Sequence, residues 1–281
     1  RIQCRNCKKV WTPKKYQKEI THPQAIETVQ LFIPFQGASA VQKLYVLVSL
    51  DATRGNILHL STNYTQHQTG DSLRYSYKGN TEPTMHHRDI VQKVDMREAQ
   101  FLRRSQFDEI QYGSAVLKRN GKGAILRPVI TAHGHFRILK IRYPDVKTHI
   151  ISHECFLRGA IITAWADQFR QQQGELWFVE EEISDSNADT PWHFKGTTYH
   201  GWWQNQWQRW EQGNNCKMVC LLTGASLERG ANVSLATSRC FITWLTDQHD
   251  FTQSALLSAG RVTQMLTSLA LKYNESLTPS C

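Results

Sequence analysis

The apolar residues of the first half of the chain fall into short runs that predict a β-meander. Leu44–Leu50 is a continuous β-prone run, which is typical of a strand buried on both faces. Asp51–Gly55 predicts a turn, and Asn56–Asn63 reads as the returning strand. Asp71–Lys78 alternates between apolar and polar residues, as a third strand does. We therefore expect three short strands joined by tight turns.

The rest of the chain alternates between helical and strand patterns. Apolar residues recur at helical spacing through 153–173, and Gly174 provides a stop. Within the strand candidate 124–132, Pro128 suggests a bulge or an edge position. The predicted helices are 95–107, 153–173, 236–247 and 253–273, and the predicted strands are 124–132, 146–151 and 175–179. This order predicts a mixed α/β domain in which helices cover a sheet.

The charge of the chain changes this picture, because it points to a polyanionic partner. With 281 residues, of which 40% are hydrophobic, the chain can bury one large core or two modest ones. It carries 33 Lys and Arg against 24 Asp and Glu, a net charge of +9. The excess lies mainly in 1–18, which holds no acid, and in 97–142. Clustered positive charge favours polyanions through counterion release, and a solubilising surface is the alternative.

Cysteine usage and hydropathy predict the compartment. The seven cysteines are an odd number without the regular spacing of a small secreted disulfide scaffold. We also find no apolar run of membrane-spanning length and no signal peptide in the sequence. We therefore expect a cytoplasmic protein with no membrane partner, and the sequence leaves homo-oligomer formation open.

Cys4 and Cys7 form the most specific motif of the chain. Two thiolates at C-x₂-C spacing supply two of the four ligands of a tetrahedral structural zinc, and we expect the second pair upstream of Cys4. The motif therefore predicts half of a zinc ribbon. Its basic neighbours make it a candidate DNA-binding element, and the residues predicted to contact DNA are Arg5, Lys8, Lys9, Lys14 and Lys15.

The strand–Asp–turn–strand segment carries a family resemblance. Leu44-Tyr-Val-Leu-Val-Ser-Leu-Asp51-Ala-Thr-Arg-Gly55 resembles the opening hairpin of the ribonuclease-H-like fold, in which the first catalytic carboxylate projects from strand one. Together with Cys4 and Cys7, it resembles bacterial insertion-sequence transposases, which place a zinc ribbon before a DDE-type catalytic domain. Pro23 and Pro34 suggest a connecting segment over 21–42. The predicted plan is a partial zinc ribbon over 1–20, this linker, and, as the resemblance implies, a ribonuclease-H-like α/β domain with a C-terminal helical extension over 43–281.

The resemblance also implies Mg²⁺-dependent cleavage and joining of phosphodiester bonds. Two-metal phosphoryl transfer needs carboxylates that hold two ions about 4 Å apart. The catalytic candidates are Asp51, Asp145 and Glu181. His133 stands where the family has its second Asp, and imidazole is a poor ligand for Mg²⁺. For the third carboxylate, the alternatives are Glu180, Glu182 and Glu228.

Two other functions remain open from the sequence. One is a DNA-binding or regulatory protein that derives from a transposase and has lost catalysis. The other is a metal-dependent hydrolase built on the cluster His133, His135, His149, His153 and Glu154, although histidines at strand ends are the more ordinary interpretation. The tryptophans of Gly201–Trp210 are candidates for core packing or for stacking on unpaired bases, and Cys216 and Cys220 are interpreted as part of a buried strand.

Overall fold

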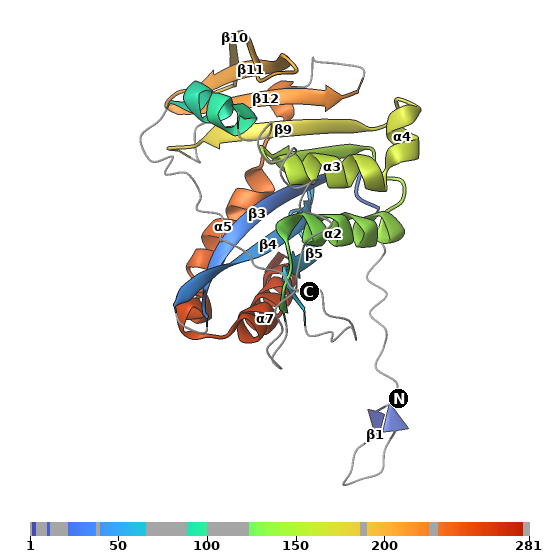
Figure 1. Cartoon of the computed structure of the whole chain (residues 1–281), viewed down its shortest axis with the longest axis vertical. Helices are drawn as coiled ribbons and strands as arrows, with labels where there is room; N and C mark the ends of the chain where they lie inside the picture. The colour runs from blue at the N-terminus through green and yellow to red at the C-terminus, as the bar shows by residue number, and fades with distance from the viewer. Residues whose placement is uncertain are drawn as a thin grey trace, which may run out of the picture.

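The computed structural model describes residues 2–3, 10–11, 22–37, 40–65, 89–99, 124–185, 190–224 and 230–277. Its centre is an eight-stranded mixed sheet with the order β10-β11-β12-β9-β8-β3-β4-β5 (Figure 1). The strands are β3 (Ala25–Gln36), β4 (Val41–Asp51), β5 (Ile57–Thr62), β8 (Thr148–Ser152), β9 (Glu175–Glu182), β10 (His193–His200), β11 (Asn205–Gln212) and β12 (Asn215–Thr223). Two short ladders join β1 (Ile2–Gln3) to β2 (Val10–Trp11) and β6 (Tyr64–Thr65) to β7 (Ala124–Ile125).

The middle of the sheet is built around β3, which corrects the predicted domain plan. The linker predicted over 21–42 is replaced by this long strand, which pairs antiparallel with β4 and parallel with β8. Parallel pairing continues from β8 to β9. The prediction for Leu44–Leu50 is confirmed, because every residue of that run is buried within β4. β4 pairs with β3 on one side and with β5 on the other. The hairpin predicted from Leu44–Asn63 is therefore the second hairpin of the sheet, after β3–β4.

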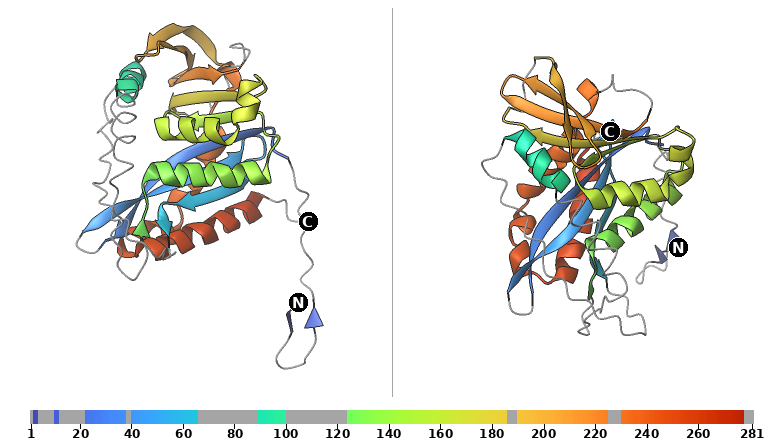
Figure 2. Two further views of the ribbon diagram at one scale, coloured as in Figure 1. Left: turned by 45° about the vertical axis from the view of Figure 1, so that its right-hand side comes forward. Right: turned by 45° about the horizontal axis from the view of Figure 1, so that its top comes forward.

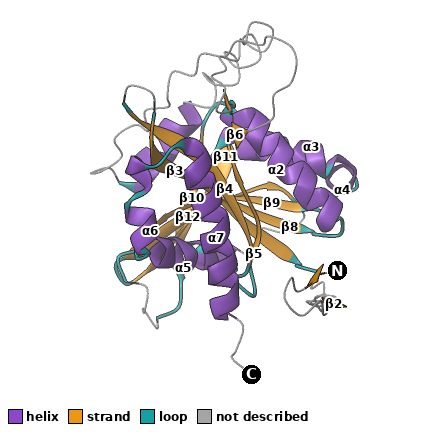
Figure 3. Cartoon of the chain, turned by 90° about the horizontal axis from the view of Figure 1, so that it is seen from below, coloured by secondary structure: helices purple, strands orange, loops and turns teal. Residues whose placement is uncertain are grey.

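Helices cover both faces of the sheet, as expected for a mixed α/β domain. One face carries α2 (Pro128–Arg142), α3 (Cys155–Ala164) and α4 (Ala166–Arg170), and the other carries α5 (Ala236–Thr246), α6 (His249–Thr252) and α7 (Ala259–Leu277) (Figure 3). Short 3₁₀ turns at Gly230–Asn232 and Ser254–Leu256 precede α5 and α7. Alternate residues of each central strand enter two cores: Val48 and Trp177 face α5 and α7, whereas Leu47 and Phe178 face α2 and α3. A further helix, residues 90–99, lies beside the β9–β11 end of the sheet (Figure 2).

The strand predicted over 124–132 was wrong for most of its length. Only Ala124–Ile125 pairs as a strand, and the rest opens α2. Pro128 occupies the first turn of this helix, where a missing N–H leaves no hydrogen bond unmade and the fixed φ suits the helix. Val129, Ala132, Phe136 and Leu139 are buried at intervals of three or four residues, which is the helical period.

The other element predictions agree with the described residues. The helix predicted over 153–173 is present as α3 and α4, which meet at Trp165. The strands predicted at 146–151 and 175–179 correspond to β8 and β9, and the helices predicted at 236–247 and 253–273 correspond to α5 and to the 3₁₀ turn with α7. The strand predicted at Asp71–Lys78 and the second half of the helix predicted at 95–107 lie outside the described residues.

In the part of the chain that the structure describes, every helix is too short or too polar to span a bilayer.

Candidate functional site

The predicted zinc and DNA-contacting residues of the N-terminus cannot be placed. Cys4 and Cys7 lie outside the described residues, and so do Arg5, Lys8, Lys9, Lys14 and Lys15. The residues on either side of the Cys motif are described, and they pair antiparallel with Ile2 opposite Trp11 and Gln3 opposite Val10. A two-stranded ladder therefore brackets the C-x₂-C segment.

Asp51 terminates β4 and caps the turn that follows. Its Oδ1 accepts hydrogen bonds from the backbone N–H of Thr53 at 2.9 Å and of Arg54 at 3.2 Å. The side chain is buried, at 3% exposure for the residue. This is the local geometry by which an Asp initiates a turn.

The three predicted catalytic carboxylates do not come together. Asp51 on β4 pairs with Ile26 on β3. In the same register across the sheet, Ile26 pairs with His149 on β8, and His149 pairs with Leu176 on β9. Glu181 lies five residues beyond Leu176 on β9, about 16 Å further along the strand direction. Asp145 is exposed in the turn that precedes β8, at the same edge as Asp51. Glu181 itself forms an ion pair with Arg239 and lies on the α5 face of the sheet.

A different set of polar residues meets where β8 ends beside the middle of β3. Gln30 on β3 donates from Nε2 to Oε2 of Glu154 at 3.4 Å, across a separation of 124 residues in sequence. Glu154 is also the N-cap of α3, and its Oε1 accepts from the Cys155 thiol at 3.1 Å and from the Phe156 backbone N–H at 3.5 Å. The carboxyl ends of parallel strands are where open α/β sheets ordinarily hold ligands, so this edge is the candidate site.

Next to Glu154, a buried hydrogen bond between His153 and Glu98 ties the edge to helical residues 90–99. His153 Nε2 lies 3.2 Å from Glu98 Oε1, and Asn205 Nδ2 lies 3.1 and 3.3 Å from the two Glu98 carboxylate oxygens. Burial lowers the pKa of His153 below its ordinary value, although the Glu98 carboxylate favours protonation. Burial would raise the pKa of Glu98, but the hydrogen bonds from His153 and Asn205 outweigh it and the pKa is lowered. A neutral imidazole thus donates to an ionised carboxylate.

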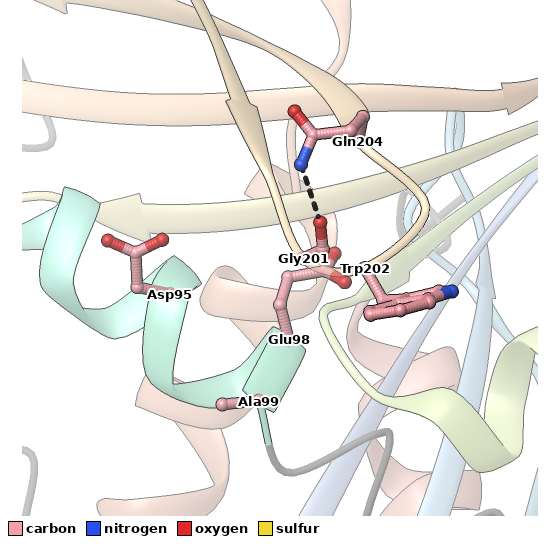
Figure 4. Close-up of a pocket in the computed structure, with 6 residues that line it drawn as sticks. All are labelled: Asp95, Glu98, Ala99, Gly201, Trp202 and Gln204. Carbon is pink, nitrogen blue, oxygen red and sulfur yellow. Dashed lines mark hydrogen bonds between the residues drawn. The ribbon is translucent and has the colours of Figure 1, made fainter.

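The same carboxylate borders an open pocket at the turn between β10 and β11. Asp95, Glu98 and Ala99 line one side of it, and the other side consists of Gly201, Trp202 and Gln204 (Figure 4). Asp95 Oδ1 lies 2.6 Å from Nδ1 of His200, which fixes this acid at the rim.

Gly201→Ala tests how tightly the β10–β11 turn is fitted around Glu98. Gly201 has a φ of +75°, and an added Cβ would overlap the Glu98 carboxylate, which His153 and Asn205 hold in place. We expect a loss of about 2–3 kcal/mol in the free energy of unfolding, measured by urea denaturation. Gly213→Ala is the matched control, because Gly213 has a φ of +56° and open space around its Cβ position, so only about 1 kcal/mol should be lost. Equal losses in the two variants would contradict the close fit.

Two more carboxylates at this edge are neutralised by the same helix. Glu180 and Glu182 lie at the end of β9, on the side of the sheet that faces helical residues 90–99. Arg97 Nε lies 3.2 Å from Glu180 Oε2. Lys93 forms the second ion pair, with Glu182. Helical residues 90–99 therefore contribute both cations and a carboxylate to the edge.

The histidine cluster is dispersed by the fold. His133 is exposed on α2, whereas His149 is buried against the Trp165 ring with centroids 4.3 Å apart. His135 is buried between two hydroxyls, with Nε2 2.8 Å from Ser49 Oγ and Nδ1 2.7 Å from Ser61 Oγ. Among the described side chains, no group of three or more His, Cys, Asp or Glu residues is arranged to hold a metal ion. His149 lies on β8 and His153 just after it, as the strand-end interpretation predicted, whereas His133 and His135 lie on the helix α2.

The tryptophans of Gly201–Trp210 are divided between β11 and the turn before it, and Cys216 and Cys220 lie on β12. Trp207 is fully buried on β11, and Trp210 packs on the opposite face of the sheet. Trp203 is exposed in the turn before β11, where the Arg158 guanidinium lies 5.6 Å from its ring. The interpretation of Cys216 and Cys220 as members of a buried strand agrees with β12, in which Cys220 is buried and Cys216 half-buried.

No family model matches this chain, and no curated protein matches it. Its function is therefore argued from geometry.

Sequence reasoning missed the residues that meet at the edge. Gln30 was overlooked because its segment was predicted to be a linker, although Ala25–Phe35 contains a β-prone run that could have indicated a strand. Glu98 and Asn205 leave no local signal, since their importance comes from meeting His153 across the fold.

Proposed function

We propose that this chain is a DNA-binding protein of the insertion-sequence transposase type, with a ribonuclease-H-like domain. The observation that carries the proposal is the order β5-β4-β3-β8-β9 within the sheet. The first three strands of this sheet in chain order, β3, β4 and β5, are antiparallel neighbours, and two parallel strands follow on the other side of β3, each after a helical connection. The ribonuclease-H-like fold has this order. One fold can host many functions, so the function also depends on the residues of the site.

An exposed basic surface on α2 and the loop after it supports DNA binding. Arg137 and Arg142 are exposed on the helix, and Lys147 is exposed just before β8. Within the described ranges, none of the three forms an ion pair with a carboxylate. Unpaired, solvated cations are available to phosphate oxygens, which is the sequence-independent part of DNA affinity.

The N-terminal motif supports the same proposal. The ladder between β1 and β2 brackets Cys4 and Cys7, as expected if the two thiolates share a zinc ion with ligands from another segment. The proposed function also includes zinc binding, a cytoplasmic location and homo-oligomer formation.

The test measures binding to a short DNA duplex by fluorescence anisotropy, at a series of salt concentrations and in the presence of EDTA. We expect the logarithm of the association constant to fall linearly with the logarithm of salt concentration. Arg137→Gln and Arg142→Gln should each reduce the slope by about 1, because each removes one phosphate contact. Arg261→Gln is the matched control, since Arg261 is exposed on α7, on the opposite face of the sheet. Absence of salt-dependent binding by the unsubstituted chain would refute the proposed function.

A further inference from the structure

The resemblance implies Mg²⁺ at the carboxyl ends of the central strands, and the residues present there do not fit it. A two-metal centre needs several carboxylate oxygens that converge without other obligations. At this edge, the β3 residue that lies beside Glu154 is Gln30, whose amide donates to the Glu154 carboxylate. An amide oxygen is a weaker partner for a hard cation than a carboxylate, and its NH₂ group donates rather than coordinates.

We infer that the protein's own cations and amide donors replace divalent metal ions at this edge, so that the chain binds DNA without cutting it. The replacement consists of Gln30 on β3 and of a charge clasp, which we define as the cations Lys93 and Arg97 together with Glu98 and its donors His153 and Asn205. This inference rests on the proposed DNA-binding function for its biological meaning. The metal-binding part stands on the contacts alone.

The strongest part of the clasp is the buried contact between Glu98 and His153. Both side chains are almost completely buried, at 1% and 0% exposure, and Asn205 contacts both carboxylate oxygens. A carboxylate with this set of donors has its lone pairs occupied on the protein side. Removing it from His153 to coordinate a metal would break the hydrogen bonds from a buried ring nitrogen and an amide, which is unfavourable because a buried donor that loses its acceptor is not resolvated.

The β9 carboxylates are neutralised more weakly. Arg97 and Glu180 are 23% and 15% exposed, and Lys93 and Glu182 are 20% and 34% exposed. Ion pairs that water reaches contribute little to stability, so a divalent ion could displace Lys93 if other carboxylates converged on it. What prevents convergence is the pair at the centre of the edge, where Glu154 caps α3 and accepts from Gln30. Gln30 is therefore the residue that prevents a divalent metal ion from binding at this edge.

Isothermal titration calorimetry with Mn²⁺ alone tests this directly on the full chain. The unsubstituted protein should show no saturable binding below about 1 mM, the weak end of protein sites for divalent cations. Gln30→Asp combined with Arg97→Met should create saturable binding at least tenfold tighter, because it adds a carboxylate beside Glu154 and releases Glu180. The control is Lys272→Met, which removes an exposed cation on α7 that contacts Gln248, and it should leave the titration unchanged.

Two outcomes with the unsubstituted chain would overturn the inference. One is saturable Mn²⁺ binding by the unsubstituted chain that disappears in Glu154→Gln. The other is cleavage of plasmid DNA by the unsubstituted chain when Mg²⁺ is added. A doubly substituted chain that folds, as judged by circular dichroism, but gains no Mn²⁺ affinity would also contradict the role given to Gln30. If that chain does not fold, the titration and the cleavage assay of the unsubstituted chain still decide the question. Failure of DNA binding in EDTA refutes the proposed function and leaves the metal result standing.

Discussion

Lowering the pH from 7 to 5 is expected to reduce the free energy of unfolding by about 4 kcal/mol or more, because the fold buries histidines in the neutral form. Burial, with a smaller contribution from Arg142, lowers the pKa of His59 from 6.5 to about 4. Burial and then Lys140 lower the pKa of His149 from 6.5 to about 3. Burial also lowers the pKa of His135 well below 6.5.

The sign follows from proton uptake by the two states. Below pH 6.5 the unfolded chain binds protons at these histidines while the folded chain does not, so stability is present above that pH and is lost as the pH falls. Each histidine contributes about 1.4 kcal/mol per pH unit, down to about pH 4 for His59 and about pH 3 for His149. At pH 5 the two together give about 4 kcal/mol, which is a large part of the roughly 5–15 kcal/mol that stabilises a typical domain.

One buried carboxyl opposes this trend. Burial raises the pKa of Glu27 above its ordinary value, against hydrogen bonds from Thr237 and Ser238 that lower it. The folded state therefore takes up this proton before the unfolded state does as the pH falls, which stabilises it relative to pH 7. A single raised carboxyl offsets part of the loss from several histidines and does not reverse it.

The measurement is urea denaturation followed by circular dichroism at half-unit steps between pH 7 and pH 4.5. His149→Phe should make the curve less steep, because the ring stays packed against Trp165 and loses a protonation site whose Nε2 has no hydrogen-bond partner among the described residues. His249→Gln is the control, since His249 is exposed on α6, and the curve should not change. A free energy of unfolding that stays constant between pH 7 and pH 5 would rule out this account.

The elements that the sequence predicted well are those whose burial is local in origin. Leu44–Leu50 is apolar at every position and forms the buried middle of β4, and the period of 153–173 gives α3 and α4. β3 was missed because Pro23 and Pro34 suggested a connecting segment, yet Pro34 lies within the strand opposite Lys43. Only the pairing with β4 and β8 identifies this segment as the centre of the sheet.

The candidate site was less accessible to sequence reasoning than the fold, because it depends on register. Asp51 follows an apolar strand as a catalytic carboxylate would, but β4 runs antiparallel to β3 and delivers Asp51 to the wrong edge for Glu154. The residues that do meet, Gln30 and Glu154, are separated by 124 positions. No spacing rule links two such residues until the parallel pairing of β3 and β8 is known.

Phe136→Ala is expected to destabilise the protein by about 3–5 kcal/mol, because it opens a cavity beneath α2. Phe136 is completely buried and meets the Trp165 ring edge-on at a centroid distance of 6.4 Å. Ile141→Ala is the matched control on the same helix: Ile141 is 73% exposed, so its truncation should change stability by less than about 0.5 kcal/mol. Urea denaturation of both variants at pH 7 provides the comparison.

Comparing Phe136→Ala with Ile138→Ala distinguishes the helix α2 from a continuation of the strand that the sequence predicted over 124–132. In a helix, positions 132, 136 and 139 share the inward face, and position 138 points outward, as the exposures of Phe136 and Ile138 (39%) indicate. In a strand, positions 136 and 138 would share one face, so Phe136→Ala and Ile138→Ala would be comparably harmful. A large loss in the first and a small loss in the second therefore supports α2, and similar losses in both would contradict it.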